Sequence, residues 1–208
     1  MPRLVTFGCS YTFGHGLVDC FMPPTNPGLH PSSYAWPNLL AKKLGYECLN
    51  LSNPGSGNFE ILMRILQTSF EKDDLVITQF SFFNRYEFYR MTDKIKQGER
   101  IPFDSEIFKE ILSESSDRYL GAYKNYWDNW LAIKLVELFL DSKQIKNCFY
   151  ISDVNDSAPE PSILEMKNFI RGIKTYRLDK GLDNSHPGPK SHETQADILY
   201  NSIIKKNI

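Results

Sequence analysis

The N-terminal segment, residues 4–14, constrains the fold of this chain most strongly. It begins with a short apolar run that includes Val5 and Phe7, which predicts a buried strand, and this run ends abruptly at Gly8. Ser10 then stands where the strand must turn. Ligands in open α/β sheets bind outside the carboxyl ends of the parallel strands, so a serine at this position is well placed for chemistry.

Two interpretations of Ser10 are open. If a helix starts just after it, the free backbone N–H groups of that helix point at the same spot. The serine is then a candidate nucleophile, and its own N–H helps to hold an oxyanion. The alternative is a serine that caps a helix or contacts a phosphate, and on this segment alone we favour that alternative.

The order of the predicted elements indicates an α/β fold with a parallel sheet. Strand, helix, strand and helix patterns alternate from the N-terminus. After the first strand, the predicted helices cover residues 36–44, 61–66, 119–140, 163–173 and 196–204, and the predicted strands cover residues 48–51, 74–80 and 148–151. The helix at 119–140 carries apolar residues that are spread widely enough to predict burial.

A long irregular segment at residues 15–34 follows directly after Ser10 and is rich in proline. Loops of this length in compact domains are usually functional or disordered, so we expect it to form a wall of the pocket. Its histidines, His15 and His30, are interpreted as solvated residues rather than ligands. Cys9 is expected to point into the core.

Composition excludes several classes of function. A chain of 208 residues fits one domain, and its net charge of −1 with scattered basic residues argues against a nucleic-acid partner. No segment approaches the roughly 18 apolar residues that span a bilayer. The four cysteines form no C-x-x-C pair, which argues against a zinc site or a disulfide framework and favours reduced thiols in the cytoplasm.

The segment around Ser10 resembles the first sequence block of the SGNH (GDSL-type) hydrolases. The residues that carry the resemblance are Gly8, Cys9, Ser10, Tyr11 and Thr12, with Cys9 where the family usually has Asp. The resemblance implies that Ser10 is the nucleophile and that its N–H is one oxyanion donor.

A second block, Asn-Pro-Gly-Ser-Gly-Asn at residues 53–58, resembles the family's second block. There a glycine N–H belongs to the oxyanion hole, and glycine suits this role because it lets a substrate approach the backbone closely. The resemblance implies Gly57 for this position, with Gly55 as the alternate because the loop could be shifted by two residues. The alternative is a plain strand-to-helix turn with an Asn N-cap.

The third block departs from the family pattern. SGNH proteins usually have Gly-x-Asn-Asp after the third strand, whereas this chain has Ser-Phe-Phe-Asn-Arg at residues 81–85. Asn84 is the candidate third oxyanion donor, although it comes about one residue late. Ser81 or Arg85 could replace it, and Asn84 could be a turn residue.

The fourth block places Asp183 and His186 three residues apart, ahead of the last predicted helix. It matches the family's Asp-x-x-His arrangement, which implies His186 as the general base and Asp183 as the carboxylate that orients it. The alternative is a surface turn, since Asp, Asn, Ser and Pro all favour turns. His192 is expected in the first turn of the final helix.

Together the four blocks favour a hydrolase. The resemblance implies a flavodoxin-like, three-layer α/β/α sandwich with a parallel sheet of about five strands. It implies one domain, residues 1–208, with an inserted polar and helical segment around residues 90–145. The expected activity is hydrolysis of a small ester, including O-acetylated sugars, by an acyl-serine mechanism without metal or cofactor.

Two other classes of function remain open. One is a binding module on the same fold, which has lost catalysis and holds a glycan or another small ligand. The other is a nucleotide- or phosphate-binding domain that uses its glycine loops, but the chain has neither a P-loop nor a Rossmann fingerprint.

Overall fold

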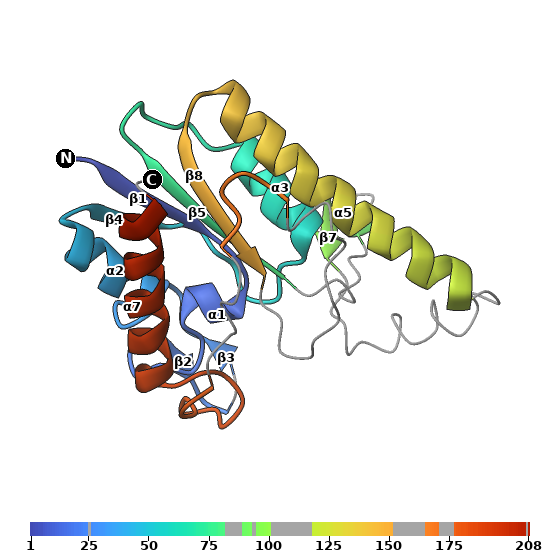
Figure 1. Ribbon diagram of the computed structural model, residues 1–208. Coiled ribbons are helices and arrows are strands. Elements are labelled where there is room, and N and C mark those ends of the chain that lie inside the picture. Colours follow the sequence, from blue (N-terminus) through green and yellow to red (C-terminus); the bar gives the residue numbers. More distant parts are fainter. Residues whose placement is uncertain are drawn as a thin grey trace.

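The computed structural model describes residues 1–24, 26–81, 89–92, 95–100, 118–151, 165–170, 177–206 and 208, with the side chains of 89–92, 95–100 and 118–126 left out. Four parallel strands form the central sheet in the order β4-β1-β5-β8, which is the order of a doubly wound α/β fold (Figure 1). These strands are β1 (Arg3–Phe7), β4 (Glu47–Asn50), β5 (Leu75–Phe80) and β8 (Lys146–Ile151). The predicted parallel α/β fold is therefore confirmed.

Helices cover both faces of this sheet. Four of them pack in pairs, α2 (Trp36–Leu44) with α7 (Pro189–Lys206) on one face and α3 (Asn58–Leu66) with α5 (Arg118–Ser142) on the other (Figure 1). Successive strand residues point to opposite faces, so Val5 packs with α3 and α5 whereas its neighbour Leu4 packs with α2 and α7. This arrangement is the expected three-layer sandwich.

The fifth strand position is occupied by a single bridge rather than a strand. Phe169 pairs in parallel with Phe149 of β8, where the N–H of Ile170 donates to the carbonyl oxygen of Phe149 at 2.7 Å. The helix predicted over residues 163–173 is therefore wrong for residues 165–170, and the rest of it lies outside the described residues. Among the described residues the sheet has four strands instead of about five.

Two short antiparallel ribbons lie outside the main sheet. One pairs β2 (Phe21–Met22) with β3 (Asn26–Pro27) inside the segment that was predicted to be irregular. The other pairs β6 (Tyr89–Thr92) with β7 (Ile95–Arg100), at the start of the predicted insertion.

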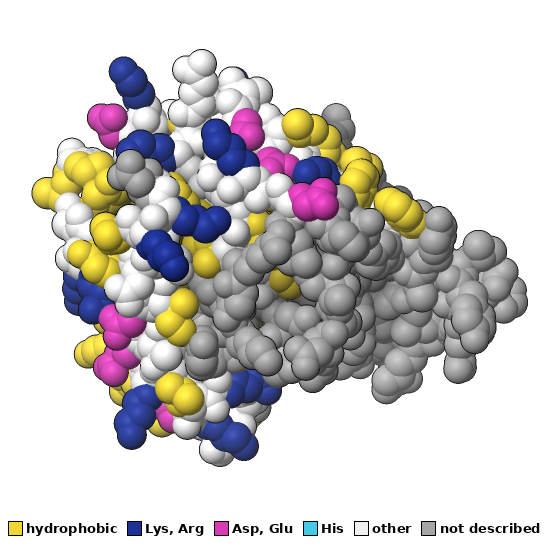
Figure 2. All heavy atoms as spheres, in the orientation of Figure 1, with side chains coloured by type: hydrophobic (Ala, Val, Ile, Leu, Met, Phe, Trp, Pro, Cys, Tyr) yellow, Lys and Arg dark blue, Asp and Glu magenta, His cyan; other side chains and the backbone are white. Residues whose placement is uncertain are grey.

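Helix α5 is buried on one side only. Ile133, Val136 and Leu140 lie in the core, whereas Leu131 and Leu138 on the other side are 50% and 62% exposed. Hydrophobic side chains follow the outer edge of this helix in Figure 2. The predicted burial is therefore confirmed for one side of the helix only, because the helix lies on the sheet as an outer layer.

No disulfide joins Cys9, Cys20, Cys48 and Cys148 in the structure. Cys9 is fully buried, as predicted. Within the described parts of the chain, none of the helices combines the length and apolar character that crossing a membrane requires.

A partly buried ion pair ties the starts of β1 and β5 together and supports a stability prediction. Arg3 donates two hydrogen bonds, at 2.8 and 2.7 Å, to the carboxylate of Asp74, which is 1% exposed. Removal of one partner leaves a buried charge without its counterion, so Arg3→Met is expected to lower the free energy of unfolding by about 3 kcal/mol in urea titrations. Lys72→Met, which removes a positive charge from an exposed position, is the control. Equal stabilities of the two variants would contradict the prediction.

Candidate active site

Ser10 lies at the start of α1 (Ser10–Phe13), at the carboxyl end of β1. The turn between them is tight because Gly8 has no side chain: a Cβ there would lie 2.8 Å from the Cβ of Thr12 and 3.2 Å from the carbonyl oxygen of Gln79. Gly14 ends the helix in the left-handed conformation, with φ of 84°. The glycines on both sides of Ser10 thus let a one-turn helix begin directly at the strand end.

Side-chain hydrogen bonds hold α1 on the sheet. The hydroxyl of Thr12 donates to Oε1 of Gln79 on β5 at 2.5 Å, and the side-chain amide of Asn50 on β4 donates to the carbonyl oxygen of Thr12 at 2.9 Å. Both strands adjacent to β1 therefore fix the helix that carries Ser10.

The loop before α7 brings Asp183 and His186 to the same place. Oδ1 of Asp183 accepts hydrogen bonds from the backbone N–H groups of Ser185 and His186, both at 3.0 Å. Oδ2 is hydrogen-bonded to Nδ1 of the His186 ring. On its other side, Nε2 of His186 lies 3.0 Å from Oγ of Ser10. The structure therefore brings together Ser10, His186 and Asp183 in one hydrogen-bonded chain.

Two glycines let this loop dock against the segment that follows α1. The N–H of Leu182 donates to the carbonyl oxygen of Gly16 at 2.7 Å. A Cβ on Gly181 would lie 2.7 Å from that same oxygen, and a Cβ on Gly16, whose φ is +91°, would lie 2.8 Å from Oδ1 of Asp183. Backbone packing without side chains thus joins the nucleophile segment to the Asp183–His186 loop.

The two ionisable groups of the loop are tuned in the direction that general-base chemistry requires. Burial acts to raise the pKa of Asp183, but hydrogen bonds from His186 and from the backbone of Ser185 outweigh it and hold this pKa at about 2. Burial lowers the pKa of His186 below its ordinary value of 6.5, while the hydrogen bond to Asp183 opposes that shift. At neutral pH the site therefore holds an ionised carboxylate beside a neutral imidazole.

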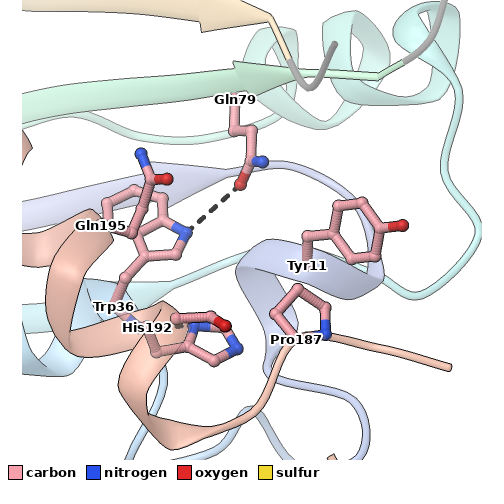
Figure 3. A pocket seen from close by; sticks show the side chains of 7 residues that line it. Tyr11, Trp36, Gln79, Pro187, His192 and Gln195 are labelled. Carbon is pink, nitrogen blue, oxygen red and sulfur yellow. Dashed lines mark hydrogen bonds between the residues drawn. The ribbon is translucent and has the colours of Figure 1, made fainter. Parts of the chain in front are cut away.

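A second buried histidine close by has a structural role. His192 lies in the first turn of α7, as expected, and its Nδ1 accepts a hydrogen bond from the backbone N–H of Trp36 at 3.2 Å. Burial lowers its pKa to about 4, so the ring is neutral. It lines a cavity of about 10 Å³ with Tyr11 and Gln79 (Figure 3), which has room for about one water molecule and none for an acyl group.

His15 occupies a position that the sequence interpretation missed. It is 9% exposed rather than solvated, and its ring packs on that of His186 with 4.2 Å between centroids. Its Nε2 lies 3.8 Å from Oδ2 of Asp183. The only sequence signal for this position was its closeness to Ser10 along the chain.

His15, Asp183 and His186 have ligand-type atoms within 4.8 Å of one another, a spacing that a metal site would also have. The two rings are only 31° from parallel, and nitrogen lone pairs lie in the ring planes, so they do not converge on one point. Oδ2 of Asp183 is already bound to Nδ1 of His186. This geometry fits a hydrogen-bonded proton-transfer group better than a metal centre.

The expected oxyanion donors lie in loops at the same end of the sheet. Gly57 is the N-cap residue of α3, and Gly55 forms the turn before it with φ of 77°. The loop is fastened to the end of β1, because the N–H of Asn53 donates to the carbonyl oxygen of Gly8 at 3.1 Å. The N-cap residue of α3 is therefore a glycine, and the alternative interpretation with an asparagine N-cap is wrong.

The third expected donor, Asn84, lies outside the described residues, as does Arg85. The backbone of Ser81 is bound by the side chain of Asn58, which accepts from its N–H at 2.7 Å and donates to its carbonyl oxygen at 3.2 Å. Asn58 also donates to Asn129 of α5 at 2.7 Å. This buried contact, which the sequence did not predict, fixes the end of β5 between α3 and α5.

Comparison with solved structures assigns the class of fold. An acetyl xylan esterase from the rumen bacterium Butyrivibrio proteoclasticus matches with a TM-score of 0.63 at 15% identity, over 99% of this chain and 64% of that one. A carbohydrate esterase, described as having divergent catalytic and non-catalytic binding functions, matches with a TM-score of 0.61 at 12% identity, over 98% and 64%. A GDSL-like lipase from Bacteroides uniformis matches with a TM-score of 0.54 at 12% identity, over 98% and 95%. The chain has the fold of the SGNH (GDSL-type) hydrolases.

Two of these three similar structures are carbohydrate esterases. The present chain spans 64% of the length of each of the two. No protein-family model matches the sequence, and no curated protein matches it.

Proposed function

We propose that this protein is a serine esterase that hydrolyses small acyl esters through an acyl-serine intermediate. The observation that carries the proposal is the hydrogen-bonded chain from Oγ of Ser10 through the ring of His186 to the carboxylate of Asp183. In this order the carboxylate holds the proton on Nδ1, which leaves Nε2 free to accept the proton of the nucleophile.

The proposed reaction has two halves. Oγ of Ser10 attacks the ester carbonyl carbon while its proton passes to Nε2 of His186, and the oxyanion accepts hydrogen bonds from the N–H groups of Ser10 and Gly57, with the Asn84 amide as the third donor. As the intermediate collapses, His186 returns that proton to the leaving alkoxide, which departs as an alcohol. Water then attacks the acyl-serine and gives its proton to His186, which passes it to Ser10 as the carboxylic acid leaves.

For the substrate we propose O-acetylated carbohydrate. Similar structures include an acetyl xylan esterase, which supports a sugar as the alcohol part of the ester. We also propose that the chain is one hydrolase domain with an insertion around residues 90–145.

The test of catalysis is covalent labelling. A fluorophosphonate probe is expected to add one adduct to the intact protein, with the modified peptide containing Ser10, because only an activated serine attacks such a probe at a useful rate. Ser10→Ala is expected to abolish the adduct, whereas Ser202→Ala, on the outer helix α7, retains it. An unlabelled wild-type protein would overturn the proposal.

The second candidate function is a binding module on the same fold. One similar structure is described as having both catalytic and non-catalytic binding functions, so the two roles coexist in this fold. Binding of acetylated sugars without hydrolysis, together with the absence of the adduct, would favour this second function.

A further inference from the structure

His15 takes no part in the proposed mechanism, although it lies among Ser10, Asp183 and His186. Its backbone N–H donates to the carbonyl oxygen of Ser10 at 3.1 Å, so it is tied to the nucleophile itself. The next residue, Gly16, accepts the hydrogen bond from Leu182 and packs against Asp183. The main chain therefore holds His15 between the nucleophile and the base.

The ring of His15 restricts the ring of His186. The two imidazole rings pack with 4.2 Å between centroids and 31° between their planes, and the ring of Tyr11 forms a T-shaped contact with His186, at 5.6 Å between centroids. An imidazole hydrogen-bonded at both nitrogens can still tilt about the line that joins them. The contacts with His15 and Tyr11 oppose that motion, which favours a ring position with Nε2 directed at Oγ of Ser10.

A charge on His15 would oppose the same chemistry. The step that activates Ser10 turns His186 into an imidazolium, which a neutral aromatic face stabilises and a second cation repels. A protonated His15 would also attract the carboxylate of Asp183, whose Oδ2 lies 3.8 Å from Nε2 of His15. Among the described residues, Arg177, Tyr11 and the buried neutral His192 also lie around His186, and His15 is the imidazole that packs directly on its ring.

We propose that His15 is a positioning residue: its ring holds the His186 imidazole in line with Ser10, and it must be uncharged for His186 to accept the proton. This inference rests on the proposed esterase function. It implies that two protons, one on each imidazole, inactivate the enzyme as the pH falls.

The experiment compares His15→Phe, which keeps a ring without a proton site, with His15→Ala, which removes the ring. Plots of log kcat/KM against pH for p-nitrophenyl acetate are expected to have a limiting acid slope of about two for the wild type and about one for His15→Phe. His15→Ala is expected to lower kcat roughly 10- to 100-fold with KM unchanged, because the imidazole loses its orientation. His30→Ala, which removes an exposed histidine of the same segment, is the matched control.

An acid slope that stays the same in His15→Phe, together with wild-type kcat in His15→Ala, would overturn the inference. A measurement that does not depend on activity follows the ring ¹⁵N chemical shifts of His186 against pH in the wild-type protein. These shifts are expected to change in two phases if His15 and His186 are coupled, and in one phase if they are not. A wild type that hydrolyses no ester but shows two phases would refute the proposed esterase function while supporting the coupling. A single phase would overturn the coupling whether or not the protein is an esterase.

Discussion

Ser10→Ala and His186→Ala are each expected to lower kcat/KM for short acetate esters by at least about 10³-fold, with folding unaffected. In the proposed mechanism the two residues act as one unit, because Nε2 of His186, which lies 3.0 Å from the Ser10 hydroxyl, accepts the proton of that hydroxyl. The double variant is therefore expected to be no slower than either single variant. The measurement is initial-rate hydrolysis of p-nitrophenyl acetate over a range of substrate concentrations.

The matched controls are Ser202→Ala and His30→Ala, which remove the same side chains from outside the site. Both are expected to retain wild-type rates. Losses that multiply in the double variant would mean that Ser10 and His186 act independently, contrary to the proposed mechanism.

Asp183→Asn is expected to lower kcat on the order of 10³- to 10⁴-fold while leaving the loop in place. The amide that replaces the carboxylate can donate to Nδ1 of His186, and this favours the tautomer whose Nε2 already carries a proton. Such a ring cannot take the proton of Ser10. The comparison is kcat at a pH where the wild type has reached its plateau.

The pH profile gives a second measurement on the same variant. In the wild type, kcat/KM is expected to rise with pH as His186 loses its proton, with a midpoint below 6.5 because burial lowers the pKa of this ring. The carboxylate of Asp183 opposes this lowering of the His186 pKa. In Asp183→Asn that opposition is lost, so the His186 pKa falls further and the acid limb of the pH profile moves to lower pH. Asp183 itself, with a pKa of about 2, stays ionised throughout this range. An acid limb that moves to higher pH would show that the carboxylate does not stabilise the imidazolium.

The parallel sheet could be predicted from local signals, whereas the grouping of Ser10, Asp183 and His186 was implied by the resemblance of their sequence blocks to those of the SGNH hydrolases. The apolar run of β1 stops at a glycine, and the Asp-x-x-His spacing lets one carboxylate reach the backbone and ring of the same histidine. Parallel strands then bring all carboxyl ends to one edge, wherever they lie in the sequence.

Other features depend on contacts that no local pattern records. His15 is buried because Gly16 docks on the loop around Leu182, a contact between distant backbone groups. The exposed side of α5 follows from its place in the outer layer, since its apolar residues are distributed all around the helix. Residues 165–170 form an edge bridge beside β8 although their apolar spacing predicts a helix, because tertiary pairing outweighs propensity.

The separation of 176 positions between Ser10 and His186, the proposed nucleophile and base, has a consequence for biosynthesis. A ribosome translates every strand of the main sheet before it reaches His186, and the nascent protein can assemble its sheet in that interval. Until the loop that carries Asp183 and His186 leaves the ribosome and docks on Gly16, the hydroxyl of Ser10 has no imidazole to accept its proton. The proposed catalytic site is therefore complete only after His186 has been synthesised and its loop has docked on Gly16.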